Sequence, residues 1–148
     1  MTDAPLLIAC PGCAAMNRVA ATRLHEAPNC GSCHRPLFQR APVALSAADF
    51  DKHAIRSTLP LVVDFWAPWC GPCLNMAPQF AAAAATLEPQ VRLAKVDTDL
   101  HPALGTRFGI RSIPTLLVIQ GGHEIGRHSG AVSSAQIVSW VRSVLSSR

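Results

Sequence analysis

The sequence lacks any apolar run long enough to cross a membrane. Its 148 residues are 49% hydrophobic and contain no tyrosine, whereas a bilayer crossing needs about 20 consecutive apolar residues. The N-terminus also lacks the basic start and the apolar run of a secretory signal. These absences predict a cytoplasmic protein without membrane association.

Charge of one sign is not concentrated in any segment either. The formal net charge is only +4, and the lysines and arginines are scattered. Proteins that bind nucleic acid usually gather such residues in a patch, so no nucleic-acid partner is expected. The length and apolar content predict one domain of ordinary size with a small appendage.

No cysteine is left outside a Cys-x-x-Cys pair. The three pairs are Cys10/Cys13, Cys30/Cys33 and Cys70/Cys73. Because a reducing cytoplasm disfavours structural disulfides, metal binding or redox catalysis is the expected role of these residues.

The first four cysteines have the spacing of a zinc site, with sixteen residues between the two pairs. Four thiolates complete a tetrahedral shell around one structural Zn(II) and leave no open position. A segment of about 40 residues has too small a core to fold unaided, so the metal would stabilise it. Two disulfides or an iron site remain alternatives. His25 and His34 are expected to be surface residues. The predicted ligands are Cys10, Cys13, Cys30 and Cys33.

The composition changes near residue 40, which divides the chain into a predicted zinc module, 1–40, and a second domain, 41–148. In the second domain strands alternate with helices and end in a hairpin. This order predicts an α/β fold, with a mixed sheet flanked by helices on both faces. The expected elements are a strand at 43–45, a helix from 46, a strand at 59–67, a helix after 70, a strand at 91–97, a short helix at 101–110, a hairpin at 114–130 and a helix from 133.

The sequence also predicts how two of these helices begin. Ser46 is the expected N-cap of the first, and Ser133 with Gln136 has the capping-box pattern in the last. The residues expected on the buried face of the first helix are Phe50, Ala54 and Ile55.

The third cysteine pair lies in WCGPC, between a predicted strand and a predicted helix. Two ligands alone do not make a metal site, and this context is typical of thiol chemistry. At a helix N-terminus the free N–H groups and the dipole stabilise a thiolate, so Cys70 is the expected nucleophile. Cys73, one turn later, is expected to resolve the mixed disulfide. Gly71 and Pro72 shape the turn.

One acid, Asp64, interrupts the apolar run LPLVVDFWA. A buried carboxylate is costly unless it has a partner or takes up a proton. With a raised pKa, Asp64 would accept the proton of Cys73 through a water molecule. It could also pair with Lys95, and the two roles are compatible.

From residue 43 to 148 the chain resembles the thioredoxin family. The matching segments are VDFWAPWCGPC, MAPQF, KVDTD, FGIRSIPTLLVIQGG and SGAV. The resemblance implies the thioredoxin fold and a cis peptide before Pro114, close to the Cys-x-x-Cys turn. The first 40 residues, with CPGC, NRV, CGSC and RPLF, are similar to the zinc-binding extension of the second bacterial thioredoxin type. Leu74 departs from the family, which often has lysine there.

The resemblance implies a protein-disulfide reductase that is recycled by an NADPH-dependent thioredoxin reductase. Neither flavin nor nicotinamide would be bound here, and the chain would act as a monomer on disulfide-containing proteins. Trp66 would pack beneath the site. A binding module or redox sensor that recruits a partner is the alternative, but the intact WCGPC argues against it. An oxidase or isomerase in an oxidising compartment is disfavoured by the Gly-Pro dipeptide. The implied docking surface consists of Trp69, Gly71, Pro72, Ile113, Pro114 and Gly130.

Overall fold

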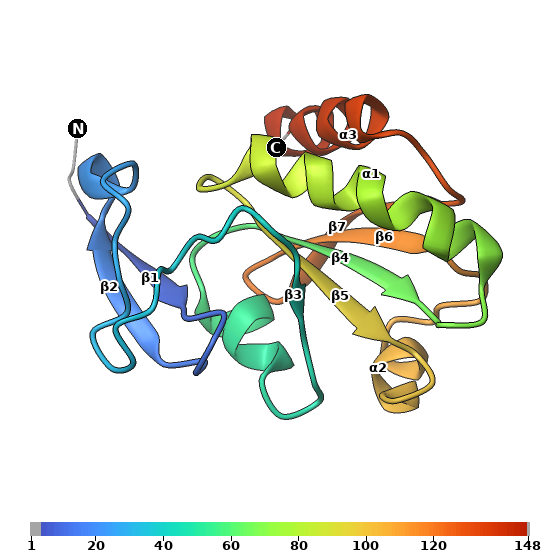
Figure 1. Ribbon diagram of the computed structural model, residues 1–148, viewed down its shortest axis with the longest axis horizontal. Helices are drawn as coiled ribbons and strands as arrows, with labels where there is room; N and C mark the ends of the chain where they lie inside the picture. Colours follow the sequence, from blue (N-terminus) through green and yellow to red (C-terminus); the bar gives the residue numbers. More distant parts are fainter. Residues whose placement is uncertain (1–3, 148) are drawn as a thin grey trace.

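The chain contains two sheets of different size. The computed structural model describes residues 4–147. A two-stranded antiparallel sheet of β1 (Pro5–Ala9) and β2 (Met16–Ala20) lies at one end of the molecule (Figure 1). The remainder surrounds a five-stranded sheet in the order β3-β5-β4-β6-β7. The small hairpin was not predicted, because the first 40 residues show little continuous apolar sequence.

The five-stranded sheet is mixed, as predicted. Strands β3, β5 and β4 run parallel, whereas β6 and β7 are antiparallel to their neighbours. Strand β4 lies at the centre, and its first five residues are buried. Its run of apolar side chains suits a strand that is covered on both faces. The strand bounds are β3 (Val43–Ala44), β4 (Leu61–Trp66), β5 (Arg92–Asp97), β6 (Thr115–Gln120) and β7 (His123–Ser129).

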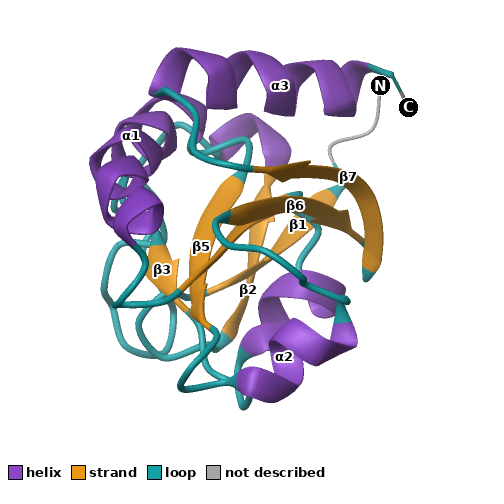
Figure 2. Cartoon of the chain, turned by 90° about the vertical axis from the view of Figure 1, so that its right-hand side faces the viewer, coloured by secondary structure: helices purple, strands orange, loops and turns teal. Residues whose placement is uncertain are grey.

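Helices cover both faces of this sheet. The helices α1 (Gly71–Leu87) and α3 (Ser134–Ser146) pack together over one face, where Val62 and Leu93 belong to their apolar core. The other face carries α2 (Pro102–Arg107) and the single π-helical turn η2 (Lys52–Arg56) (Figures 1 and 2). The predicted order of elements beyond residue 40 is therefore confirmed.

The capping box of α3 is confirmed. The hydroxyl of Ser133 accepts a hydrogen bond from the Gln136 N–H at 3.2 Å, and the Gln136 side chain accepts one from the Ser133 N–H at 2.9 Å. Each residue thus satisfies a main-chain donor that the first helical turn would otherwise leave without a partner.

The first helix differs from the prediction in two respects. Ser46 does not cap with its side chain; instead its N–H and hydroxyl both donate to the Asp49 carboxylate, at 2.7 and 3.1 Å. Ile55 was expected to be buried but is 47% exposed, and His53 is buried in its stead. The cause is the π-helical turn, whose wider i→i+5 bonding shifts the inward-facing positions away from those of an α-helix.

The small sheet is docked on the larger domain through its first strand. Thr58 donates its N–H to the Leu7 carbonyl and accepts the Leu7 N–H on its hydroxyl, both at 2.7 Å. Leu59, from the segment that precedes β4, joins the apolar core of the N-terminal module. The module and the domain therefore share both hydrogen bonds and buried surface.

A buried ion pair completes this junction. Arg92, at the start of β5, is only 2% exposed and lies 3.1 Å from the carboxylate of Glu88. The same guanidinium donates to the carbonyls of Ala9 at 3.1 Å and Leu37 at 2.8 Å, both in the N-terminal module. The second carboxylate oxygen of Glu88 accepts the Arg40 N–H at 2.6 Å. Both charges are thus compensated, which a buried pair requires.

Replacing one partner should reveal how strongly this junction depends on the pair. We expect Glu88→Gln to lower the free energy of unfolding by about 3 kcal/mol, because Arg92 would keep a buried charge without its counterion. Urea denaturation measures the loss. The matched control is Glu26→Gln in the exposed Arg23–Glu26 pair, which should cost less than about 1 kcal/mol. Equal losses in the two variants would contradict the assignment.

Candidate functional site

The third cysteine pair lies where β4 leads into α1. Cys70 is the N-cap of α1, and its sulfur accepts a hydrogen bond from the Cys73 N–H at 3.2 Å. The two cysteines form a disulfide. Pro72 occupies the first turn of the helix, where a main-chain donor is not needed. The helix N-terminus therefore points its positive dipole end and an N–H group at the Cys70 sulfur.

The disulfide is covered on most sides. Cys70 is 5% exposed and Cys73 is 2% exposed, and Trp66 and Ile113 pack against them. Trp69, in contrast, is 71% exposed. Cys70 is therefore slightly more exposed than Cys73, and the exposed Trp69 immediately precedes it in the chain.

Asp64 is buried without compensation. It is 0% exposed, and within residues 4–147 neither carboxylate oxygen has a hydrogen-bond partner. Burial raises the pKa of Asp64 to about 7, although the positive charge of Lys95 opposes the shift. The carboxyl group can therefore gain or lose a proton near neutral pH.

The predicted pairing of Asp64 with Lys95 is corrected by the structure. The two residues are register partners on β4 and β5, yet no ion pair joins them in the described part of the chain. The Lys95 ammonium instead lies 4.4 Å from the centroid of the Trp66 ring. Side chains of register partners extend to the same face of a sheet, but their charged ends need not meet. The Trp66 ring offers the Lys95 ammonium a favourable, more exposed position.

Two further segments meet the disulfide. The Cys70 sulfur lies 3.8 Å from the carbonyl oxygen of Ile113, and the Ile113–Pro114 peptide is cis. The Gly130 N–H donates to the Pro114 carbonyl at 2.9 Å, which fixes the end of β7 beside this loop. A cavity of about 300 Å³ opens between Trp69 and Ile113 and continues toward α2. The fold thus brings most of the predicted docking residues to one side of the disulfide, with Gly71 and Pro72 exposed next to it.

The other four cysteines converge in the N-terminal module. Their sulfur atoms all lie within 4.8 Å of one another, and the Cys10–Cys33 and Cys13–Cys30 pairs are each 3.6 Å apart. A tetrahedral zinc ion with Zn–S bonds of about 2.3 Å places its sulfurs about 3.8 Å apart. The donor set and its spacing therefore fit one zinc ion.

The main chain around these sulfurs favours their charged form. The Gly12 N–H donates to the Cys10 sulfur, and the Ser32 N–H donates to the Cys30 sulfur, both at 3.3 Å. The N–H of Cys33 also faces Cys30, and this hydrogen bond and the Asn17 amide lower the pKa of Cys30 to about 5. A metal-binding cysteine must be deprotonated, so the donors at Cys10 and Cys30 suit the predicted role, whereas desolvation and the neighbouring cysteine sulfurs raise the pKa of Cys13 to about 11.

Asn17 belongs to the NRV segment of the resemblance, but no role of its own was predicted for it from the sequence. Its side-chain amide donates to the Cys30 sulfur at 3.5 Å, and its side-chain oxygen accepts the Gly31 N–H at 2.9 Å. A hydrogen bond to a sulfur imposes no fixed spacing, so the sequence alone did not predict this contact. His25 and His34 are exposed and lie outside the cysteine cluster, as expected.

Comparison with known proteins agrees with both parts of the structure. The sequence model of the family described as "Thioredoxin" matches residues 41–143, and the one described as "Thioredoxin 2, N-terminal", a zinc ribbon, matches residues 9–35. "Thioredoxin C-3" of Corynebacterium nephridii is 41% identical over 136 residues, which cover 92% of this chain and 93% of that protein. "Thioredoxin 1" of Synechococcus elongatus is 43% identical over 89 residues, covering 60% of this chain and 83% of the relative.

The chain belongs to the thioredoxin family. Its fold is the predicted thioredoxin fold, with a small four-cysteine module at the N-terminus. It is accordingly a protein-disulfide oxidoreductase, and its Cys70 and Cys73 are joined in a disulfide. Among the described residues, no helix is both long and apolar enough to span a membrane.

The raised pKa of Asp64 gives a stability test with a defined sign. Because the folded-state pKa of about 7 exceeds the ordinary value of 3.8, the folded state binds the proton more tightly. Stability should therefore fall as the pH rises from about 4 to about 7. We expect Asp64→Asn to be more stable than the parent protein by roughly 2–4 kcal/mol at pH 8, with the difference gone near pH 4.

Urea denaturation across this pH range measures the effect. The matched control is Asp99→Asn, which changes an exposed carboxylate and should follow the parent profile. A parallel profile for Asp64→Asn at every pH would show that Asp64 is not the responsible group.

Proposed function

We propose that the protein reduces disulfides in other proteins, with Cys70 as the attacking sulfur, and that an NADPH-dependent thioredoxin reductase restores the dithiol. The position of Cys70 at the N-terminus of α1 supports this assignment most directly. There the Cys73 N–H and the helix dipole stabilise a thiolate on Cys70.

The reaction has two exchange steps. The Cys70 thiolate attacks one sulfur of the target disulfide, so a Cys70–target bond forms, the target S–S bond breaks, and the other target sulfur leaves as a thiolate. Cys73 then attacks the Cys70 sulfur, which forms the Cys70–Cys73 disulfide and releases the second target thiolate. The target gains two electrons and takes two protons, and this protein loses the same two electrons.

Asp64 would act in the second step. Cys73 must lose its proton before it can attack, and Asp64 is the buried carboxylate whose pKa lies close to neutral pH. With no hydrogen-bond partner among the described residues, its carboxylate would accept the proton of Cys73 through a water molecule. Its role is that of a general base.

The docking surface would consist of Trp69, Gly71, Pro72, Ile113 and Gly130, with Pro114 beside the sulfur. Its exposed apolar groups suit brief contacts with many partners. Leu74, 52% exposed on the next turn of α1, extends the apolar character where many relatives have a charge. We further propose that the protein acts as a monomer, without nucleic acid or membrane, in the cytoplasm, where reducing conditions keep Cys10, Cys13, Cys30 and Cys33 as metal-binding thiolates.

The zinc ion would be structural. Cys10, Cys13, Cys30 and Cys33 would hold it, and they offer no open coordination position for a substrate. When bound, the ion supplies folding free energy to the N-terminal module, whose own apolar core is small.

The catalytic assignment predicts opposite outcomes for the two cysteines. Cys70→Ser should abolish reduction of insulin, because no nucleophile remains for the first step. Cys73→Ser should instead accumulate a mixed disulfide with the target, which non-reducing electrophoresis and mass spectrometry detect. Full insulin reduction by Cys70→Ser would exclude the mechanism, and failure of the parent protein to turn over with NADPH and a thioredoxin reductase would exclude the proposed recycling.

The metal assignment predicts about one zinc ion per chain by elemental analysis, as expected for four ligands in one tetrahedral site. Chelation of the metal should raise amide hydrogen exchange in residues 4–40 far more than in the thioredoxin domain. Cys30→Ala should lose the metal, whereas the matched control His34→Ala should retain it. Retention of a full equivalent of zinc by Cys30→Ala would rule out the proposed ligand set.

A further inference from the structure

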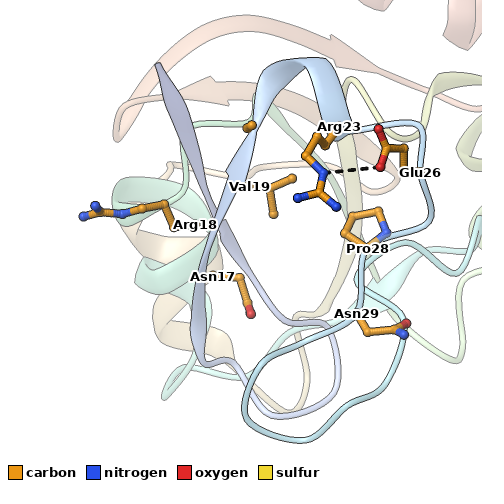
Figure 3. A pocket seen from close by; sticks show the side chains of 8 residues that line it. Asn17, Arg18, Val19, Arg23, Glu26, Pro28 and Asn29 are labelled. Carbon is orange, nitrogen blue, oxygen red and sulfur yellow. Dashed lines mark hydrogen bonds and ion pairs between the residues drawn. The ribbon is translucent and has the colours of Figure 1, made fainter. Parts of the chain in front are cut away.

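A groove runs along the outer edge of β2, on the side of that strand away from β1. Its volume is about 330 Å³, and Figure 3 shows it between the strand and the loop that leads to the second cysteine pair. In Figure 1 the N-terminal sheet and the start of α1 lie at opposite ends of the molecule, so the groove is remote from the Cys70–Cys73 disulfide. The groove is lined by Asn17, Arg18, Val19, Ala20, Arg23, Glu26, Pro28 and Asn29.

The register of the hairpin shows which main-chain groups face this groove. Leu7 on β1 directs both its N–H and its carbonyl at Thr58, away from β2. When a residue of an antiparallel pair points its N–H and carbonyl away from the neighbouring strand, the residue opposite does the same, and the two are not hydrogen-bonded to each other. The partner of Leu7 is Arg18. The N–H and carbonyl of Arg18 therefore point to the outer edge, where no hydrogen bond engages them within residues 4–147.

The opposite wall carries a second main-chain segment with outward-facing groups. Asn29 forms a bridge with Pro36 in which the hydrogen bonds come from the flanking residues, Cys30 to Arg35 and Leu37 to Pro28. The N–H and carbonyl of Asn29 consequently have no partner in that bridge. The groove is therefore bounded by two extended segments, one at Arg18 and one at Asn29, which do not pair with each other.

A side-chain contact lies at each end of the groove. Near the cysteines, the Asn17 side chain bonds to the Gly31 N–H at 2.9 Å. At the far end, Arg23 and Glu26 form an ion pair at 3.3 Å (Figure 3). The Asn17–Gly31 hydrogen bond therefore links β2 to the facing loop, whereas the exposed Arg23–Glu26 pair is local to the turn that follows β2.

The charge of the module indicates the sign of a ligand. Residues 4–40 contain four arginines, Arg18, Arg23, Arg35 and Arg40, and one acid, Glu26, a formal excess of three positive charges (4 − 1), which a zinc ion held by four thiolates (−2) would reduce to one. Arg18 is exposed and forms no ion pair in the described part of the chain. Its side chain extends to one face of β2, whereas Val19 extends to the other, toward the module core (Figure 3).

We propose that this edge binds an extended segment of a partner protein by strand addition, and that the segment alternates acidic and apolar residues. Its main chain would bond to the N–H and carbonyl of Arg18, as an added strand does at a free edge. An acidic side chain beside Arg18 would share that residue's face, and the next, apolar residue would face Val19 and Pro28. The site would hold a partner by its main chain while leaving the redox pair free, and it does not depend on the proposed catalytic steps.

The test is an NMR titration of the zinc-loaded full chain with the peptide Ac-Glu-Val-Glu-Val-Glu-NH2. The amide signals of Arg18, Ala20 and Asn29 should shift, and exchange of the Arg18 amide should slow at least threefold at saturation. The peptide Ac-Lys-Val-Lys-Val-Lys-NH2 should bind at least tenfold more weakly at low salt. N-methylation of the acidic peptide at alternate residues should abolish binding, because it removes the strand's donors without altering the protein.

Two variants at one position separate the main-chain contribution from the charge. Arg18→Pro deletes the outward N–H, a change that edge strands tolerate, and should weaken acidic-peptide binding at least tenfold. Arg18→Ala keeps that N–H and should weaken binding about threefold, with loss of the preference for the acidic peptide. Insulin reduction and zinc content report whether each variant is folded, and both should match the parent protein.

Several results would overturn the proposal. They are an absence of shifts at millimolar acidic peptide, unchanged binding of the N-methylated peptide, and equal binding of the acidic and basic peptides. A single-stranded oligonucleotide that shifts the same amides at lower concentration would assign the edge to nucleic acid instead. Shifts that depend on protein concentration alone would assign it to a second copy of this chain.

Discussion

The arrangement of the redox site depends on the burial of β4 at the centre of the sheet. Neighbours on both sides and helices on both faces cover this strand, so its side chains must be apolar and its chain can leave the core only at its ends. Its carboxyl end leads directly into α1 and thereby sets Cys70 at the helix N-terminus. The one acid within the strand, Asp64, is enclosed by the same packing, which is the cause of its raised pKa.

The three Cys-x-x-Cys pairs share one main-chain hydrogen bond but differ in the groups that their sulfurs contact. In each pair the residue after the second cysteine donates its N–H to the carbonyl of the first cysteine, from Ala14, His34 and Leu74, at 2.9 to 3.1 Å. Ala14 and His34 then adopt positive φ values of 63° and 66°, which turns the chain back and closes a knuckle.

Leu74 instead continues the right-handed helix of α1. The knuckles can therefore direct their sulfurs at those of a second knuckle, whereas the helical pair has only its own partner and forms a disulfide. The same spacing thus accompanies a four-sulfur cluster in one setting and a disulfide in the other, and the backbone conformation after the second cysteine differs between the two.

The features that the sequence predicted well are those with a local cause. The capping box of Ser133 and Gln136 depends on residues three positions apart, and the buried strands follow from continuous apolar runs. The prediction was wrong for Ser46 and Ile55, because the helix there contains a π-helical turn that no local pattern marks. The Glu88–Arg92 pair was missed for another reason: its partners, the carbonyls of Ala9 and Leu37, are far away in the sequence.

The buried Glu88–Arg92 ion pair joins the N-terminal module to the thioredoxin domain. Arg92 begins β5, which lies next to β4, and its guanidinium holds the carbonyl of Ala9, the residue before Cys10. A buried arginine is stable only while its partners remain, so a rotation of the N-terminal module on the sheet would leave the charge of Arg92 exposed or without its partners. The edge of β2 is therefore carried at a fixed distance from the Cys70–Cys73 disulfide. A partner bound at that edge would present to the redox pair only those of its disulfides that lie at a matching distance, so the module would select targets by geometry as well as by affinity.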